Sequence, residues 1–494
     1  MSSLDKIENI VVLMLENRPF DHMLGFLKSQ IYPIEGLTGN ETIPMDPDDS
    51  SSQPVAVNNG ANYRGDFNVD PNDDKTFIDP GHEVDSVHQQ IFRGASSAQP
   101  INEGFVYDYL QQSNKSGPNT PQHAQDIVRC FAPEKLPVLT TLAQEFAVCD
   151  HWFSSMPGPT WPNRLFVHAA TSAGQTDNSL HEDAYNIDTI YDRLEDANFS
   201  WRIYFHDFPQ SLALVHLQQD FVVKHRYKLF GDFLDDARTG RLPAYSFIEP
   251  RYTDFLALKA NDQHPPHDAA LGEHLIADVY EAVRNSPQWE KSLLVLLWDE
   301  HGGIYDHVPP PQTVNPDGKV SLQPACDFTR LGVRVPCVLV SPYIAGGTID
   351  SQVYDHTSLL ATVEKRFGLL PLTNRDAQAN TFESIFSIAT PRTDAPTQLQ
   401  RPTDPISQTA YDDSKTKLAD MEAAAVRNSL RAGQFAGVSA SDFQTSLVRL
   451  TKHLTIQEED SISQTLRLAQ WSEREHDAAM QVRDFATRFF KHLF

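Results

Sequence analysis

The amino-acid sequence predicts an α/β protein with a mostly parallel β-sheet that is covered by helices on both faces. Short segments rich in β-forming residues alternate along the chain with helical patterns, which is typical of βαβ units. Three strand candidates are near-continuous apolar runs rather than alternating ones. That pattern is expected for strands buried on both faces of a parallel sheet.

The expected elements follow one another along the chain. The strand candidates, of which the first, fifth and sixth are the near-continuous runs, are residues 9–15, 146–149, 201–205, 244–248, 292–298 and 333–340. The clearest helical patterns are residues 163–171, 189–198, 230–239, 269–285 and 357–367. Ligands bind at the carboxyl ends of the strands in such a sheet, so polar residues at those ends are candidates for a functional site.

Two regions differ from this pattern. Residues 39–74 are rich in Asp, Asn, Ser, Pro and Gly, and we expect a loop insertion or lid on one large domain at residues 1–390. Residues 400–494 contain strong helix formers and predict a helical C-terminal region. Its last segment, MQVRDFATRFFKHLF, is amphipathic, which favours a helix docked on the core, with membrane contact as the second interpretation.

The net charge of −26 at pH 7 narrows the class of partner. Such a surface repels nucleic acid and anionic membranes, but it leaves neutral or zwitterionic lipid open. The chain has no apolar run of 18 residues, so we expect no transmembrane segment. The first residues lack a basic stretch and a cleavage site, so a cytoplasmic location is the default expectation, with signal-independent export left open.

Oxygen-bearing side chains follow two of the apolar strand candidates. Glu16 and Asn17 come directly after the first, and Asp299 and Glu300 come directly after the fifth. Two adjacent carboxylates repel each other unless a cation or a proton lies between them. An all-oxygen ligand set suits a hard divalent cation, with Ca²⁺ as the first choice and Mg²⁺, Mn²⁺ or Zn²⁺ as alternatives.

A hydroxyl and several histidines add to this candidate site. Thr160 follows Pro-Gly-Pro and precedes a helix, where the simplest interpretation is an N-cap, although a helix N-terminus is also a natural phosphate site. Four histidines lie in loop-like settings, where a single histidine is usually just solvated. Together they suggest phosphate binding, protonation of a leaving group or a second metal site: His82, His264, His267 and His356.

Several longer stretches resemble a known family. They are ENRPFDHMLGFL, DPGHEVDSVHQQIF, MPGPTWPNRLF, YSFIEPRY, HPPHDAALGEHLIADVYEAVRNSPQW, LLWDEHGGIYDHVPPP and RLGVRVPCVLVSPYI. In this order they are similar to the phosphoesterase family of plant non-specific phospholipases C, bacterial phospholipases C and a bacterial acid phosphatase. That family belongs to the alkaline phosphatase superfamily, so the resemblance implies an alkaline-phosphatase-like fold, with residues 1–390 as the catalytic domain.

The resemblance also implies a role for each candidate residue. Thr160 would be the nucleophile and also a metal ligand, and the four histidines would contact phosphate or act as general acid. The remaining metal ligands would be Glu16, Asn17, Asp299 and Glu300. A second ion would bind His264, Asp268 and His356.

The implied reaction is that of a metal-dependent phospholipase C. It would hydrolyse glycerophospholipids such as phosphatidylcholine at a membrane surface, giving diacylglycerol and a phosphorylated headgroup through a phosphothreonine intermediate. The HPPHDAALG and WDEHGG stretches are more similar to the phospholipases than to the acid phosphatase. A phosphomonoesterase is the alternative enzyme, and a non-catalytic lipid-binding module is the alternative from another class.

Overall fold

A central eight-stranded sheet organises the protein. The computed structural model describes residues 3–415 except 65, 68–76, 96–98, 115–116, 180–184, 220–221, 223–224, 255–257 and 323. The strand order is β14-β6-β13-β10-β1-β9-β7-β8. In that order the strands are Thr348–Asp350, Ala147–Cys149, Cys337–Val340, Ser292–Trp298, Asn9–Leu15, Tyr245–Glu249, Trp201–Phe205 and Tyr227–Leu229.

The sheet is mostly parallel, as predicted. Strand β1, NIVVLML, is buried along its whole length and pairs in parallel with β10 on one side and β9 on the other. The remaining pairs on the β9 side and the pair β6–β14 are also parallel. Of the eight strands in this sheet, β13 runs against the other seven.

Strand β13 corrects one detail of the prediction. The apolar run 333–340 was expected to be a strand of parallel type, but the strand covers Cys337–Val340 and is antiparallel to both of its neighbours. A strand covered on both faces needs apolar side chains whichever way it runs, so an apolar run carries no information on direction. Strands β1, β7 and β10 have the predicted bounds.

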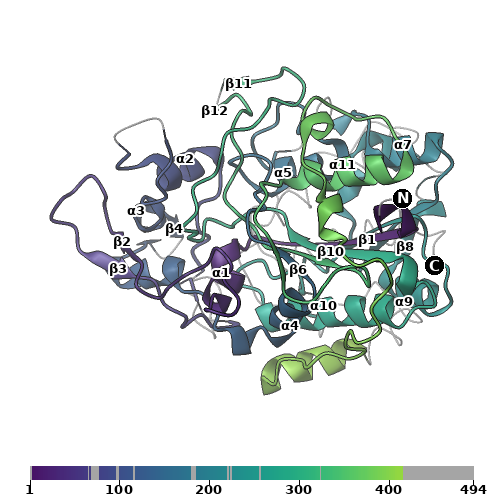
Figure 1. The fold of residues 1–494 in the computed structure, drawn as a ribbon. Coiled ribbons are helices and arrows are strands. Elements are labelled where there is room, and N and C mark those ends of the chain that lie inside the picture. The colour runs from purple at the N-terminus through teal and green to yellow at the C-terminus, as the bar shows by residue number, and fades with distance from the viewer. Residues whose placement is uncertain are drawn as a thin grey trace, which may run out of the picture.

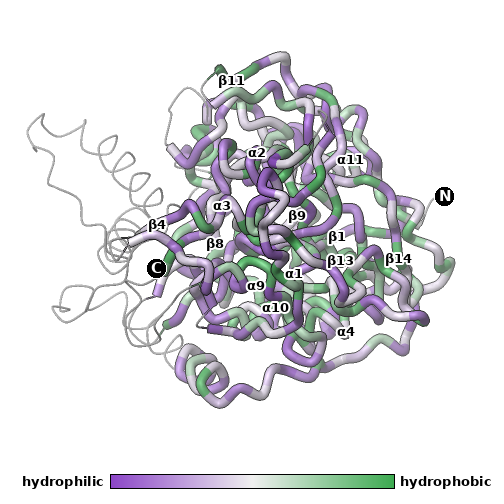
Figure 2. Tube along the Cα trace, turned by 90° about the vertical axis from the view of Figure 1, so that its left-hand side faces the viewer, coloured by the Kyte–Doolittle hydropathy of each residue, from purple (hydrophilic) through white to green (hydrophobic). Residues whose placement is uncertain are grey.

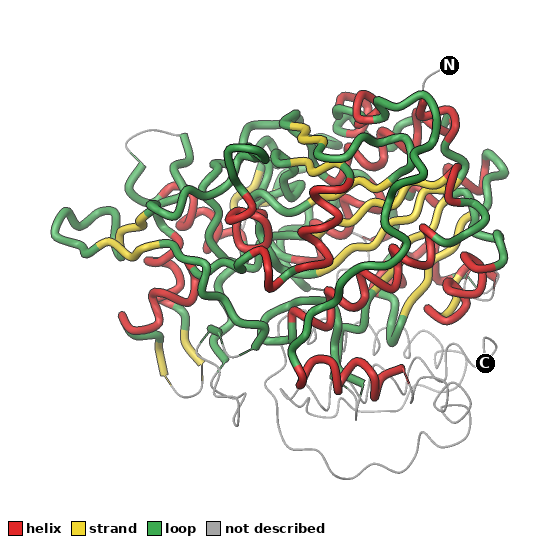
Figure 3. The backbone as a smooth tube through the Cα atoms, turned by 60° about the horizontal axis from the view of Figure 1, so that its bottom comes forward, coloured by secondary structure: helices red, strands yellow, loops and turns green. Residues whose placement is uncertain are grey.

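Helices cover both faces of the sheet, which confirms the predicted fold class. Figure 1 shows α5, α7 and α11 on one face and α4, α9 and α10 on the other, and Figure 3 shows the strands side by side between them. The first three are Thr160–Ala169, Ile190–Asp196 and His356–Phe367. The second three are Pro137–Glu145, Phe230–Arg238 and Ala269–Arg284.

Smaller elements lie outside the main sheet. Three short helices are α1 Phe20–Leu24, α2 Val84–Phe92 and α3 Phe105–Gln111. Three two-stranded hairpins pair β2 Thr42–Pro44 with β3 Pro54–Ala56, β4 Ser113–Asn114 with β5 Gly117–Pro118, and β11 Ser321–Leu322 with β12 Ala325–Cys326. The β2–β3 hairpin lies within residues 39–74, whose action as a lid stays a prediction.

The C-terminal region is only partly described. Residues 405–415 are helical, and residues 416–494, which include most of the predicted helical region and its amphipathic last segment, lie outside the described residues. Among the described residues, no helix combines the length and the apolar character that crossing a membrane requires.

Candidate active site

The carboxyl ends of β1 and β10 place Glu16 and Asp299 side by side. Leu15 is in register with Trp298, and the backbone N–H of Asp299 donates to the Leu15 carbonyl oxygen at 3.1 Å. The next residue of each strand therefore projects from the same edge of the sheet. Both carboxylates are completely buried. Glu16 and Asp299, which follow two separate strands in the sequence, therefore lie together at one edge of the sheet.

The turn after Asp299 closes tightly over Asn17. Asn17 has a φ of 52°, and its backbone N–H donates to Asp299 Oδ1 at 2.9 Å. Gly302 has a φ of +63°, and a Cβ atom there would lie 2.5 Å from the Asn17 carbonyl oxygen. Only glycine combines this backbone conformation with so close an approach. Glu300 is also fixed in the turn, because its Oε2 accepts from the backbone N–H of Gly302 at 2.6 Å.

Thr160 faces the same strand ends. It is the first residue of α5, whose N-cap is Pro159 with no side-chain capping bond, so the simple N-cap interpretation of Thr160 is wrong. Its hydroxyl instead lies 3.5 Å from Asn17 Oδ1 as a long hydrogen-bond donor, and the side chain is completely buried. The helix N-terminus therefore presents this hydroxyl to the polar cluster rather than using it for its own backbone.

The oxygen atoms of this cluster suit a divalent cation by their chemical type. Glu16 Oε2, Asp299 Oδ2 and Glu300 Oε1 are buried and have no hydrogen-bond partner among the described residues. Burial raises the pKa of Glu16 well above its usual value, and burial together with the charge of Glu300 raises the pKa of Asp299 to about 6. Buried carboxylate oxygens without partners are costly unless a cation or a proton satisfies them. Carboxylates of this kind are suitable ligands for Ca²⁺, Mn²⁺ or Zn²⁺.

Arg164 belongs to the cluster, although the sequence analysis assigned it no role. Its guanidinium forms a fully buried ion pair with Glu16, its Nε lies 3.8 Å from Asp299 Oδ2, and it stacks over the Tyr252 ring at 5.3 Å. Burial lowers the pKa of Arg164, but the carboxylate of Glu16 and the other acidic groups around it together outweigh this effect and raise the pKa. The spacing of Thr160 and Arg164 was a usable signal, because residues i and i+4 share one face of a helix.

Three of the four predicted histidines lie together. The His264 ring centroid is 6.4 Å from that of His82 and 6.1 Å from that of His267. Asp262, which the sequence analysis missed, ties the group together. Its Oδ1 contacts His267 Nδ1 at 2.7 Å and accepts from the His264 backbone N–H at 3.1 Å, while its carbonyl oxygen accepts from the Glu16 backbone N–H at 2.9 Å.

His356 is separate from this group. It is the first residue of α11, and its Nε2 donates to the Asp299 carbonyl oxygen at 2.6 Å. Its Nδ1 accepts from Trp152 Nε1 at 3.4 Å, so both ring nitrogens are engaged within the protein. Burial lowers the pKa of His356 to about 4, which makes the ring neutral near pH 7. These contacts position Asp299 and leave neither ring nitrogen directed at a phosphate.

The structure does not join Asp268 to the second predicted metal set. Asp268 is the N-cap of α10, and its Oδ1 accepts from the Ala270 backbone N–H at 3.0 Å. Its Oδ2 accepts from Arg64 Nη1 at 2.5 Å and from the Ser407 hydroxyl at 2.7 Å. Both oxygens are thus engaged by residues outside the site, and Asp262 is the carboxylate that accompanies His264 and His267.

A further acidic group includes Asp21 of α1. In the described part of the chain, Asp21, Asp306 and His307 form the one set of His, Cys, Asp or Glu ligand atoms within 4.8 Å of one another. Buried Arg334 already pairs with Asp21 at 2.9 Å and with Asp306 at 3.1 Å. Arg334 and His307 thus offset the charge of this group. Glu16 Oε2, Asp299 Oδ2 and Glu300 Oε1 lack a hydrogen-bond partner among the described residues, so they stay our candidates for a metal site.

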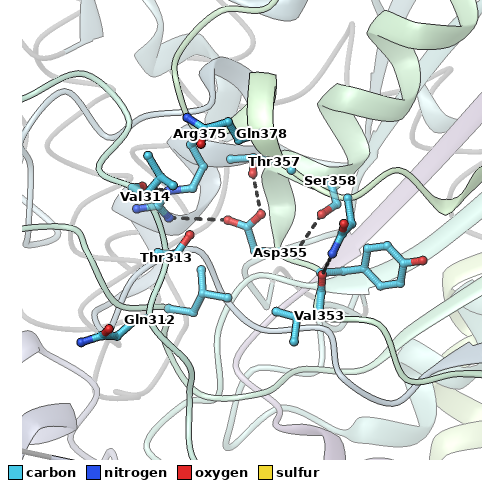
Figure 4. Close-up of a pocket in the computed structure, with 13 residues that line it drawn as sticks. Gln312, Thr313, Val314, Val353, Asp355, Thr357, Ser358, Arg375 and Gln378 are labelled. Atoms are coloured by element: carbon cyan, nitrogen blue, oxygen red, sulfur yellow. Dashed lines mark hydrogen bonds and ion pairs between the residues drawn. The ribbon is translucent and has the colours of Figure 1, made fainter.

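A small pocket lies beside the N-terminus of α11. It has a volume of about 120 Å³ and is lined by Asp355 and Arg375, among others (Figure 4). The Asp355 carboxylate accepts from the Ser155 and Thr357 hydroxyls at 2.9 and 2.5 Å and lies 3.6 Å from Arg375. The polar groups that border the pocket contact one another, so their positions are explained by contacts within the protein.

Comparison with known proteins agrees with this geometry. The profile of the Phosphoesterase family matches residues 7–370, a span that includes every candidate residue named above. The chain belongs to the phosphoesterase family. Non-specific phospholipase C6 from Arabidopsis thaliana is 41% identical over 441 residues, which cover 84% of this phosphoesterase and 80% of the plant protein. Phospholipase C B from Mycobacterium tuberculosis (strain CDC 1551 / Oshkosh) is 30% identical over 448 residues, 81% of each chain.

This membership makes the protein a phosphoric ester hydrolase. Solved structures are more remote. A protein in the alkaline phosphatase superfamily from Vibrio parahaemolyticus matches with a TM-score of 0.31 and 9% identity over 57% of this chain and 80% of that one. A likeness at this level says nothing about activity.

Proposed function

We propose that this phosphoesterase is a divalent-metal-dependent phospholipase C. It hydrolyses glycerophospholipids such as phosphatidylcholine to diacylglycerol and a phosphorylated headgroup, and a phosphothreonine forms on the way. The relatives named phospholipase C support the substrate class. The observation that carries the mechanism is the buried hydroxyl of Thr160, which lies against Asn17 beside carboxylate oxygens that have no partner among the described residues.

Glu16, Asn17, Thr160, Asp299 and Glu300 would hold the metal. When bound, the ion supplies positive charge beside the phosphate and the attacking hydroxyl. Ca²⁺ is the first choice for these oxygen ligands, with Zn²⁺ and Mn²⁺ as alternatives.

The chain's own side chains account for the bond changes. Thr160 Oγ1 releases its proton to solvent and attacks phosphorus in line, and the bond from phosphorus to the diacylglycerol oxygen breaks. His267 donates a proton to that oxygen, because the Asp262 carboxylate at 2.7 Å stabilises the charged imidazole. His267 then accepts a proton from the water that cleaves the phosphothreonine. The oxygen of Thr160 takes up a proton from solvent again when water cleaves the phosphothreonine. The ring of His264 lies 6.4 Å from that of His82 and 6.1 Å from that of His267, which supports a shared role for these three side chains in contacting the phosphate.

The alternative enzyme is a phosphomonoesterase. The same nucleophile and metal site would release inorganic phosphate from a soluble monoester, and the candidate site does not itself set the size of the leaving group. A non-catalytic lipid-binding module is the alternative outside the enzymes. The presence of Thr160 and of the candidate carboxylates argues against it.

Product analysis separates these functions. We expect the purified protein to release diacylglycerol and phosphocholine from phosphatidylcholine, to lose this activity on chelation, and to regain it with one divalent ion. Release of phosphate from a monoester without any diacylglycerol would favour the phosphomonoesterase. No hydrolysis of either substrate with any of the three ions would favour the binding module.

A further inference from the structure

The hairpin of β11 and β12 and the segment that leads into it carry an unusual share of the exposed apolar side chains. Eight large hydrophobic residues are exposed among the described residues, and three of them lie between 314 and 322. Val314 is 39% exposed, Val320 is 57% exposed and Leu322, next to the hairpin turn, is 84% exposed. Figure 2 shows β11 at the rim of the molecule. Apolar side chains that gather on one projection mark a binding surface more often than scattered ones do.

The base of this hairpin is firmly held. Thr313 and Thr329 share a backbone hydrogen bond of 2.8 Å, and Asn315 donates to the carbonyl oxygens of Lys319 and Asp327 at 2.7 and 2.8 Å. Arg375 donates to the Val314 carbonyl oxygen at 2.5 Å. The apolar residues therefore stand on a braced support, so their exposure is a property of the fold and does not depend on a loose loop.

The hairpin stands next to the segment that carries Thr160. Cys326 and Phe328 pack against Met156, which lies four residues before Thr160, and against Phe166 of α5 and Val84 of α2. The hydroxyls of Ser321 and Thr176 lie 3.5 Å apart. Figure 1 shows the hairpin projecting from the side of the molecule that holds α2 and α5. A surface that docks there brings its lipids close to the candidate nucleophile.

The charge of the segment around the hairpin indicates which kind of lipid surface it can bind. We call residues 312–330, which include the hairpin, the arm. The arm contains two acidic residues, Asp317 and Asp327, and two basic ones, Lys319 and Arg330, so it has no net charge in a protein with a net charge of −26. An anionic membrane would be repelled by the rest of the protein and would gain nothing from the arm. An electrically neutral surface with an accessible hydrocarbon layer matches both its charge and its apolar tip.

We propose that the β11–β12 hairpin docks this protein on zwitterionic phospholipid surfaces by inserting Val320 and Leu322 between the lipids. This inference rests on the proposed phospholipase function and adds how the enzyme meets its substrate. The hairpin takes no part in the chemistry. It raises the local concentration of lipid at the site, so its loss weakens action on a membrane and spares action on a dissolved lipid.

The test compares two double variants of the full chain. Val320→Asp with Leu322→Asp places charges at the hairpin tip. Ile31→Asp with Leu370→Asp makes the same change at two other apolar residues, which are 95% and 76% exposed. Each protein is assayed for sedimentation with phosphatidylcholine vesicles, for hydrolysis of those vesicles, and for hydrolysis of a short-chain phosphatidylcholine below its critical micelle concentration.

We expect the hairpin variant to bind and hydrolyse vesicles at least about tenfold more weakly than the wild type, as burial of two aliphatic side chains implies. Its rate on the dissolved lipid should stay within about twofold of the wild type, and the control variant should match the wild type in every assay. Equal vesicle binding by the hairpin variant and the wild type would overturn the proposal. Self-association of the wild type through the hairpin, with no vesicle binding, would also overturn it.

The same assays keep the two proposals apart. If the wild type hydrolyses neither vesicles nor dissolved phosphatidylcholine, the proposed function fails, while the sedimentation result still decides the docking surface. If the wild type hydrolyses both and the hairpin variant keeps its full rate on vesicles, the function stands and the docking surface fails.

Discussion

Arg164 and Glu16 form an ion pair in which both side chains are fully buried. The same guanidinium also lies 3.8 Å from Asp299 Oδ2, so one cation stands between the two strand-end carboxylates. A buried charge that loses its partner is strongly destabilising. We therefore expect Arg164 to offset part of the negative charge of Glu16 and Asp299 when no metal is bound.

Replacement of Arg164 should make stability depend on metal. With a chelator present, Arg164→Leu should lower the free energy of unfolding by about 3–5 kcal/mol, because Glu16 and Asp299 are left without a counter-charge. Divalent ions should restore more stability to the variant than they add to the wild type. Denaturant unfolding with and without chelator measures both effects. Arg238→Leu, at an exposed pair with Asp235, should change stability by less than about 1 kcal/mol. A similar loss in both variants would contradict this assignment.

Thr160 gives a direct test of the nucleophile. Thr160→Ala should reduce turnover at least about a thousandfold, since loss of an attacking group removes the covalent route. Thr160→Ser should keep turnover within about tenfold of the wild type, and unfolding transitions should show both variants folded. Mass spectrometry of the quenched wild-type reaction should find phosphate on Thr160. Near wild-type turnover in folded Thr160→Ala protein would sink the phosphothreonine mechanism.

Replacement of Gly302 tests the close contact between the turn after Asp299 and Asn17. Gly302→Ala should lower activity by about tenfold or more, because its Cβ would lie 2.5 Å from the Asn17 carbonyl oxygen and would push the turn away from Thr160. Gly318→Ala is a matched control, since Gly318 also has a positive φ, +78°, but open space around it. Both variants carry the backbone penalty of alanine at positive φ, of order 1 kcal/mol. Steady-state kinetics and thermal unfolding separate the two effects, and equal activity losses would argue against a role for the close approach.

The raised pKa of His307 predicts that the protein loses stability at high pH. Burial lowers its pKa, but the hydrogen bond to Asp21 and the charges of Asp21 and Asp306 together outweigh that effect and raise the pKa to about 9 from an ordinary value of 6.5. The charged form is favoured in the folded state, so its contribution is fully present below pH 6.5 and is lost as pH rises through 9. The difference in unfolding free energy between the wild type and His307→Gln should shrink by up to about 3 kcal/mol over that window. A constant difference from pH 6 to 10 would refute the assignment.

The parts of the fold that were predictable are those with a strong local pattern. Strands β1 and β10 have the predicted bounds, because each is a run of apolar residues after its first position and ends where polar residues begin. Glu16 and Asp299 could be brought together by reasoning, since neighbouring parallel strands end at one edge. The direction of β13 was not predictable, because direction depends on the path of the chain and not on the composition of the strand.

The missed residues lacked such a pattern. Asp262 lies in a loop with no apolar strand directly before it, and it reaches the site through a contact between its carbonyl oxygen and the Glu16 backbone. In the sequence, Arg164 looks like an ordinary exposed basic residue on a helix. Asp268 and His356 looked suitable as ligands by type, but their polar atoms are engaged by Arg64 and by the Asp299 backbone, partners that only the folded chain brings near.

The central position of β1 has a consequence for biosynthesis. Ile10 pairs with Tyr245 on one side and with Leu293 on the other, so the first strand leaves the ribosome 235 residues before either neighbour exists. At ordinary translation rates of about 5–20 residues per second, this wait lasts roughly 10–50 seconds. During that time the segment NIVVLML is an unpaired strand that is apolar at every position after Asn9, the kind of segment that aggregates or recruits chaperones. The nascent chain cannot complete its sheet, or bring Glu16 to Asp299, until β10 has been made.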